Sequence, residues 1–381
     1  MKQMVDILYP YRWLDYMMVV LALVALLYQV MLVRPNPKGK VTVADGCIVI
    51  LLVMFTVSFM RKGMEDYANY MKVLSAFLMY FVGRIYYERI QECEGALSLS
   101  SYIVVYANLI YRVIHHGTAL FQVENAMGDL YYYDTDLGVA MLIALSFIAM
   151  YARNNMRKFF TMFVVIPYMV CFSDAGVQKG LMVVMFGLLF LYVLEMAGVK
   201  KKVANFLLGA SIVGLLVVVM ILISPVFTGS DNNMFVEFMQ AYVGNAKNIY
   251  ERYDSWRTVW NSISSSSLWA KLFGLGLEKD IAVYSFYLKT LYVMGIMGLV
   301  LIFVFVGSVV YYVIQVEDRK TYYVTALLAI MVLGTGLLSN SIEATQMSWY
   351  PMMFAGMVVS SVQAERRKTS FDDYLWEGMA E

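Results

Sequence analysis

The stretch LKTLYVMGIMGLVLIFVFVGSVVYYVIQ, from Leu288 to Gln315, carries a single charged side chain, that of Lys289. Its apolar residues run continuously instead of alternating with polar ones, which predicts a helix and not a half-buried strand. A helix needs about 20 mostly apolar residues to cross the hydrocarbon core of a bilayer. Because lipid offers no partners to backbone polar groups, only helices and closed barrels span it. The stretch therefore predicts a membrane-spanning helix.

Similar apolar runs recur along the whole chain of 381 residues, which is 61% hydrophobic and only 15% charged. Soluble domains average about 45–50% apolar and about 25% charged residues, so the composition favours an all-α polytopic membrane protein of about 11–12 transmembrane helices. The further predicted spans are 14–33, 41–60, 70–87, 99–114, 137–151, 158–173, 180–198, 204–226, 322–339 and 346–363.

The runs divide the chain into four parts. Residues 1–226 form a transmembrane bundle of about eight or nine spans, and residues 227–287 form one large loop. Residues 288–363 add three C-terminal transmembrane helices, and residues 364–381 form a tail. A loop this long within a compact protein is usually functional or disordered.

Lys and Arg residues in short loops predict the orientation, because cytoplasmic loops carry an excess of them. The basic loops after residue 115 lie around Arg153, Lys200, Arg319 and Arg366, which predicts a cytoplasmic C-terminus and an extracytoplasmic 227–287 loop.

The N-terminal orientation has two alternatives. Eleven spans with an inside C-terminus put the N-terminus outside, and one extra spanning or re-entrant piece puts it inside. Asp45 at the start of the second span, with Arg61 and Lys62 at its end, is typical of a helix that runs from outside to inside. We therefore expect the inside arrangement.

Several function classes are disfavoured by the composition. The net charge of +1 argues against nucleic-acid binding, and the three scattered cysteines suggest neither a disulfide framework nor a zinc site. The sequence contains no Walker, HExxH or GxSxG motif. We expect no metal and no cofactor, so the candidate chemistry rests on charged residues in or beside the membrane, which are costly there and by default suggest function.

The 227–287 loop contains an apolar stripe with alternating steps of four and three, which predicts one amphipathic helix on or near the outer membrane surface. Arg252 and Arg257 fall on either side of this stripe, and Asp254 lies between them. A plain interfacial helix also places Arg there, because its stem stays in apolar surroundings while its head stays wet. The stripe consists of Phe235, Met239, Tyr242, Ala246, Ile249, Tyr253, Trp256, Trp260 and Ile263.

Other charged residues lie in or beside the apolar runs. Arg84 lies within one, where a role in binding and simple snorkelling near a helix end are equally good readings. Asp174 and Lys179 lie at the outer end of a helix pair, where a polar hairpin is the alternative. Lys289 begins a helix against the macrodipole, so it requires a compensating anion or a functional role. Glu343, in an outer turn, reads mainly as a solvated carboxylate.

In its order and spacing of motifs over roughly residues 170–300, the chain resembles the O-antigen polymerase and ligase superfamily, most closely the Wzy-type polysaccharide polymerases. SWRTVW contains Arg257 and Trp260, FGLGLE contains Gly274 and Gly276, and a Gly-rich helix follows. QKGL, with Lys179, stands where the family has an SRxG-like motif. The resemblance implies a GT-C-like fold in the bacterial cytoplasmic membrane.

The resemblance also implies a metal-independent glycosyl transfer on the outer face of that membrane, making O-antigen, capsule or exopolysaccharide. The donor is a glycan on undecaprenyl pyrophosphate, and the acceptor is another lipid-linked repeat unit. Membrane lipids, a chain-length regulator and a flippase are the other partners it suggests. Arg252, Arg257 and Lys179 are the candidate ligands of the pyrophosphate, with Lys289 in support. Asp254, Asp174 and Glu343 are the candidates for the base, and Trp256, Trp260, Tyr284 and Arg84 for further substrate contacts.

Two departures from the family pattern bear on the activity. First, Lys179 replaces an Arg of the family pattern. Second, Tyr284 and Ser285 stand where a ligase has a His-Asn pair, and the missing His favours a polymerase over a ligase. A ligase remains the nearer alternative. A transporter or flippase of lipid-linked oligosaccharide is the alternative from another class, and such proteins often show repeated halves and broken helices near the midplane.

Overall fold

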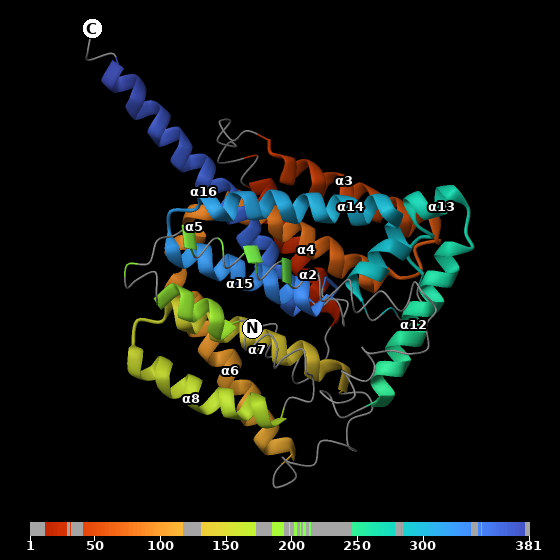
Figure 1. The fold of residues 1–381 in the computed structure, drawn as a ribbon, viewed down its shortest axis with the longest axis horizontal. Coiled ribbons are helices and arrows are strands. Elements are labelled where there is room, and N and C mark those ends of the chain that lie inside the picture. Colours follow the sequence, from red (N-terminus) through yellow and green to blue (C-terminus); the bar gives the residue numbers. More distant parts are fainter. Residues whose placement is uncertain are drawn as a thin grey trace.

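The computed structural model describes residues 12–28, 41–116, 131–172, 185–193, 246–278, 285–336 and 345–377, with isolated residues between these ranges. Every regular element in this part is a helix, which confirms the predicted all-α class there (Figure 1). The helices are α2 Arg12–Tyr28, α3 Val43–Arg61, α4 Tyr67–Ile85, α5 Tyr87–Glu92, α6 Glu94–His116, α7 Tyr131–Tyr151, α8 Asn155–Phe172, α12 Ala246–Ser264, α13 Leu268–Phe273, α14 Phe286–Gln315, α15 Arg319–Thr335 and α16 Thr345–Glu377.

Two of the described helices, α3 and α14, are long and apolar enough to cross a membrane, and residues 16–28 and 139–151 form shorter apolar helices. In the most apolar window of α3 and of α14, only 39% of the residues are buried in the protein. Large apolar side chains such as Val53 and Phe303 are 53% and 46% exposed. These faces are suited to an apolar environment outside the chain.

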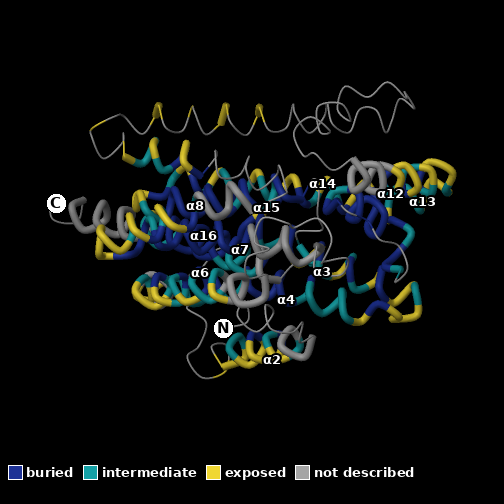
Figure 2. The backbone as a smooth tube through the Cα atoms, turned by 90° about the horizontal axis from the view of Figure 1, so that it is seen from below, coloured by how far each residue is buried: buried dark blue, intermediate teal, exposed yellow. Residues whose placement is uncertain are grey.

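The buried side chains lie along the middle of the bundle, on α4, α7, α15 and α16, whereas much of α2 and α13 is exposed (Figure 2). α4 and α16 run side by side in the same direction at very close range. A Cβ atom on Gly83 would lie 1.9 Å from the carbonyl oxygen of Met353, and one on Gly356 would lie 2.0 Å from that of Tyr80. Small residues at a helix contact allow this approach.

The bundle has two ends. At one end, α12 and α13 lie across the first turns of α14, and we call this the Lys289 end (Figure 1). At the other, α4 ends at Ile85, the starts of α6, α8 and α15 and the end of α7 line one pocket, and we call this the Arg84 end. α14 therefore runs from the Lys289 end to the Arg84 end.

The structure corrects the expected direction of α3. The Ser58 hydroxyl donates to the carbonyl oxygen of Val293 at 3.0 Å, and Lys62 lies 3.3 Å from Glu278. The last turn of α3 thus lies at the Lys289 end, beside the chain that leaves α13. We expected Arg61 and Lys62 on the opposite side from this loop, and that expectation is wrong because both side chains are bonded to it.

α2 starts at the same end of the bundle as the 227–287 loop, whereas we expected the N-terminus on the opposite side from this loop. The Tyr16 and Tyr67 rings lie 5.6 Å apart at the start of α4, and the Tyr86 hydroxyl donates to the carbonyl oxygen of Ala25 at the end of α4. α2 therefore also starts at the Lys289 end. At the other terminus, α16 continues to Glu377, well past the predicted span 346–363, and projects from the bundle (Figure 1).

Candidate functional site

α14 consists of two helices joined at Gly295, whose φ of 69° and ψ of −167° are not helical. The rings of Tyr287 and Phe303 lie 6.1 Å apart and nearly parallel. In a straight helix, residues so far apart in sequence would be separated by about 24 Å along the axis. The first segment, Phe286–Met294, therefore bends sharply back beside the second, with Gly295 at the tip.

The tip is held by the last turn of α13 and by the chain that follows it. Gly295 lies against Leu272, and a Cβ atom on Gly295 would lie 2.4 Å from the Leu272 carbonyl oxygen. Because the break ends the helical hydrogen-bond pattern, carbonyl oxygens near Gly295 need other donors. The backbone N–H of Leu275 donates to the Tyr292 carbonyl at 2.7 Å, and Ser58 donates to that of Val293.

The base of the folded-back segment is anchored on the last turn of α15. The N–H of Phe286 donates to the carbonyl oxygen of Gly336 at 2.7 Å, and the Tyr287 hydroxyl donates to that of Leu333 at 2.8 Å. The segment is almost fully buried. Its position is thus fixed at both ends by bonds to other elements.

Lys289 lies in the first turn of this segment and is 9% exposed. Its Nζ lies 3.5 Å from Oε1 of Glu343, and the two side chains are 11% and 13% exposed. The prediction that Lys289 needs a compensating anion is confirmed. The prediction that Glu343 is a solvated carboxylate is wrong, because the turn before α16 places it against this buried cation.

A second polar cluster lies on the other side of the tip. Oε2 of Glu278 accepts hydrogen bonds from the Tyr292 hydroxyl at 2.8 Å and from Lys62 at 3.3 Å. The bond from Tyr292, reinforced by the Lys62 ammonium, lowers the pKa of Glu278 and outweighs the opposing effect of burial. Arg61 donates to the carbonyl oxygen of Gly274 at 3.3 Å. Polar groups therefore surround the tip on the bundle surface.

α12 presents the predicted apolar face from Trp256 onward. Trp256, Val259 and Ile263 are buried, with Trp256 only 2% exposed, while Trp260 is half-buried. Asp254 and Arg257 are exposed on the opposite side. Among the described residues, the Trp256 indole N–H has no hydrogen-bond partner. The helix ends at Ser264, at the start of the serine run that predicted its end.

The other predicted site residues do not all join this end of the bundle. Arg84 lies at the opposite end, where its Nη2 lies 2.8 Å from the Asp45 carboxylate and its Nη1 donates to Ser360. It therefore positions helices and does not extend the candidate site. Arg252 lies within α12, but its side chain is outside the described part. Lys179, Asp174 and Tyr284 lie outside the described residues altogether.

The sequence reading missed Lys62, Glu278 and the break at Gly295. Lys62 was interpreted only as a topology signal, and Glu278 was not among the candidate residues. The glycine pair Gly295 and Gly298 was visible within the apolar run, but glycines are frequent in transmembrane helices. Only contacts with Leu272 and Ser58, remote in sequence, define the break.

Comparison with known proteins adds no relative: no family model, no curated protein and no solved structure matches the chain.

Proposed function

We propose that the chain is a membrane glycosyltransferase that extends a polysaccharide from lipid-linked repeat units. The Lys289 end would then face outward and the Arg84 end would face the cytoplasm. The distribution of basic loops supports this orientation. The connections at the Arg84 end carry Arg153, Arg157, Lys158, Arg319 and Lys320, and the segment between α2 and α3 carries Arg34, Lys38 and Lys40.

The buried Lys289–Glu343 pair is the observation that carries the proposal. An ionisable pair buried at a helix start is costly and by default suggests function. It lies at the same end as Arg257, which is exposed on the helix that covers α14. A pyrophosphate bound there would meet cations from two elements, and a carboxylate would be available for a sugar hydroxyl.

The reaction that suits these groups is a displacement at the anomeric carbon of the donor. The acceptor hydroxyl oxygen forms the new bond to that carbon, and the bond to the carrier pyrophosphate breaks. Glu343 takes the proton of the hydroxyl. Arg257 and Lys289 stabilise the negative charge that develops on the leaving pyrophosphate, through hydrogen bonds to its oxygens.

The break in α14 is the one observation that favours a transporter, because broken helices line many transport sites near the midplane. Its position argues for the enzyme instead. From Ile296 to Gln315 the second segment has about 20 residues, or about 30 Å, which by itself spans the hydrocarbon core. The break thus falls at one surface, where the pyrophosphate of a lipid carrier lies. A ligase fits the same geometry and differs only in its acceptor.

The proposal is tested by Arg257→Ala in the native cell. We expect polymer on the cell surface to disappear while single repeat units accumulate on the carrier lipid and the amount of protein stays unchanged. Asn261→Ala, one turn later and equally exposed on α12, is the matched control and should leave the polymer intact. Full-length polymer in the Arg257 variant would exclude the assigned role, and repeat units held on the cytoplasmic leaflet would indicate a flippase.

A further inference from the structure

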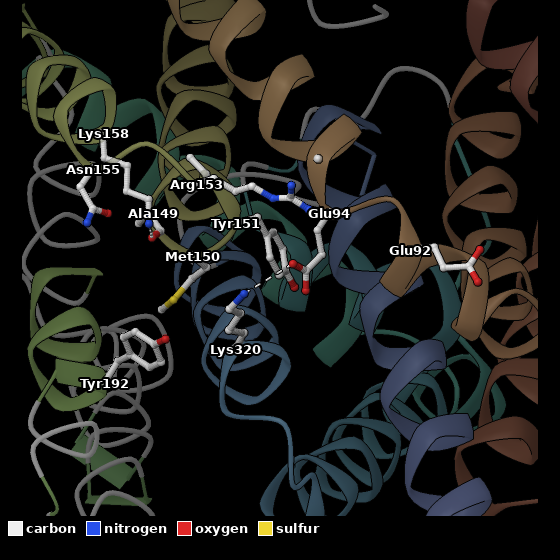
Figure 3. Close-up of a pocket in the computed structure, with 12 residues that line it drawn as sticks. Glu92, Glu94, Ala149, Met150, Tyr151, Arg153, Asn155, Lys158, Tyr192 and Lys320 are labelled. Carbon is white, nitrogen blue, oxygen red and sulfur yellow. Dashed lines mark hydrogen bonds and ion pairs between the residues drawn. The ribbon is translucent and has the colours of Figure 1, made fainter.

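A pocket of about 470 Å³ lies at the Arg84 end, far from the candidate glycosyl-transfer site. It is formed where the first turns of α6, α8 and α15 meet the last turn of α7 (Figure 3). Pockets that hold small organic ligands have volumes of about 300–1,000 Å³. The pocket is therefore large enough for more than a single ion.

Three cationic side chains line this pocket, each from a different segment: Arg153 follows α7, Lys158 belongs to α8, and Lys320 to α15. Two carboxylates also line it. Glu94 lies 3.5 Å from Lys320 and compensates that cation, and the Glu92 side chain points away from the labelled cationic groups of the pocket (Figure 3). Lys158 donates to the carbonyl oxygen of Ala149 at 3.0 Å, and no carboxylate in the described part of the chain forms an ion pair with it.

Arg153 has no hydrogen-bond or ion-pair partner among the residues that the structure describes, and its guanidinium extends toward the Glu94 side of the pocket (Figure 3). The backbone adds to the positive potential. The N-termini of α6, α8 and α15 all meet here, and each carries a partial positive charge of about half an elementary charge. Of these, α15 is capped by Asp318, whose carboxylate accepts from the N–H groups of Lys320 and Thr321.

We infer that this pocket binds a phosphate group carried by an organic molecule, with Lys158 and Arg153 as its cationic ligands. Lysine and arginine at helix N-termini are the groups that proteins use for phosphate. The ring and hydroxyl of Tyr192 on the pocket wall would contact the organic part. The phosphate belongs either to a soluble ester or to a lipid headgroup, since the pocket opens at the end of the bundle. The site does not depend on the proposed function, because it shares no residue with the Lys289 end.

Equilibrium dialysis of the purified full-length chain in a neutral maltoside detergent, with radiolabelled inorganic phosphate, tests this site. We expect saturable binding of one phosphate per chain. Lys158→Gln and Arg153→Gln should each weaken it at least about tenfold, the usual worth of one charge-assisted hydrogen bond. Lys271→Gln, on α13 at the other end of the bundle, is the matched control and should bind as the natural chain does.

Two further measurements separate the sources of the phosphate. Phosphatidylglycerol added to the micelles competes with inorganic phosphate if the natural ligand is a headgroup, whereas glucose 1-phosphate alone competes if it is a soluble ester. Either result supports the site. Non-saturable binding, or saturable binding that survives in both the Lys158 and the Arg153 variant, would overturn it, since both variants leave the Lys320–Glu94 ion pair in place.

Discussion

Lys289 places a positive charge in the first turn of a buried helix, where the macrodipole opposes it. The sequence was sufficient to predict that this charge has a compensating anion or a functional role. It did not identify the anion, because Glu343 lies in another turn and only the packing of α14 against α15 and α16 brings the two together. A buried pair of this kind is poor evidence for stability but good evidence for a role.

Removing either partner leaves the other charge buried and alone. Lys289→Leu or Glu343→Leu should therefore lower the free energy of unfolding by about 3 kcal/mol. The double variant should return to within about 1 kcal/mol of the natural chain, because two apolar side chains replace the pair. Denaturant titration of the protein in detergent measures this, and polymer synthesis should be lost in all three variants.

Comparison of the two single variants with the double variant distinguishes a catalytic role of the Lys289–Glu343 pair from a structural one. A double variant that regains both stability and polymer synthesis would show that the pair serves only packing. A double variant as unstable as either single variant would show that Glu343 is not the partner that compensates Lys289.

At the scale of elements, the break in α14 depends on glycine. Gly295 has a φ of 69° and a ψ of −167°, a conformation that costs other residues about 1–3 kcal/mol, and its Cβ position is occupied by the Leu272 backbone. Gly295→Ala should therefore destabilise the protein by about 3 kcal/mol or more. Gly307→Ala in the second segment, where a Cβ meets nothing within 4 Å, should be neutral or stabilising by up to about 1 kcal/mol. Equal effects of both substitutions on thermal unfolding would show that α14 is a straight helix.

The Glu278 cluster makes the stability of the folded protein depend on pH. Because Tyr292 and Lys62 lower the pKa of Glu278, its ionised form stabilises the fold above the unfolded pKa of about 4.3. That contribution is lost as the pH falls through the lower pKa of the folded state. Glu278→Gln should lower Tm at pH 7, and the Tm values of the variant and the natural chain should converge as the pH falls below the lowered pKa of the folded state. A constant difference from pH 7 to pH 3.5 would contradict this account.

The elements themselves were largely predictable, because their causes are local. The helix over Trp256–Ile263 follows from a repeat of four and three, and its end follows from the serines after Ile263. The fold-back of α14 was not predictable in this way. Its first segment is held in place by bonds that involve Leu275, Ser58 and Tyr287 and backbone atoms distant in sequence, and no pattern within the apolar run encodes these bonds.

At the scale of the whole molecule, the direction of the first helices is the main difference from expectation. Arg61 and Lys62 suggested a cytoplasmic end for α3, because exposed cations usually lie there. Their partners, Gly274 and Glu278, lie in the chain after α13, so these cations bind the loop instead. A rule that counts charges cannot distinguish free cations from paired ones.

Cysteine labelling tests the resulting arrangement in intact cells. In a chain without native cysteines, Asn261→Cys on α12 and Glu65→Cys between α3 and α4 should both react with an impermeant maleimide. Asn155→Cys, at the opposite end, should react only after the membrane is permeabilised. If Glu65→Cys behaved like Asn155→Cys, the direction of α3 assigned here would be wrong.

The most direct test of the proposed function is polymerisation by the purified protein in liposomes, supplied with undecaprenyl-pyrophosphate-linked repeat units from its own host. We predict a ladder of glycans that differ by one repeat unit, formed without added metal, and no ladder with the Arg257→Ala protein. Repeat units that cross the bilayer without any growth in length would contradict the central claim and identify the chain as a transporter.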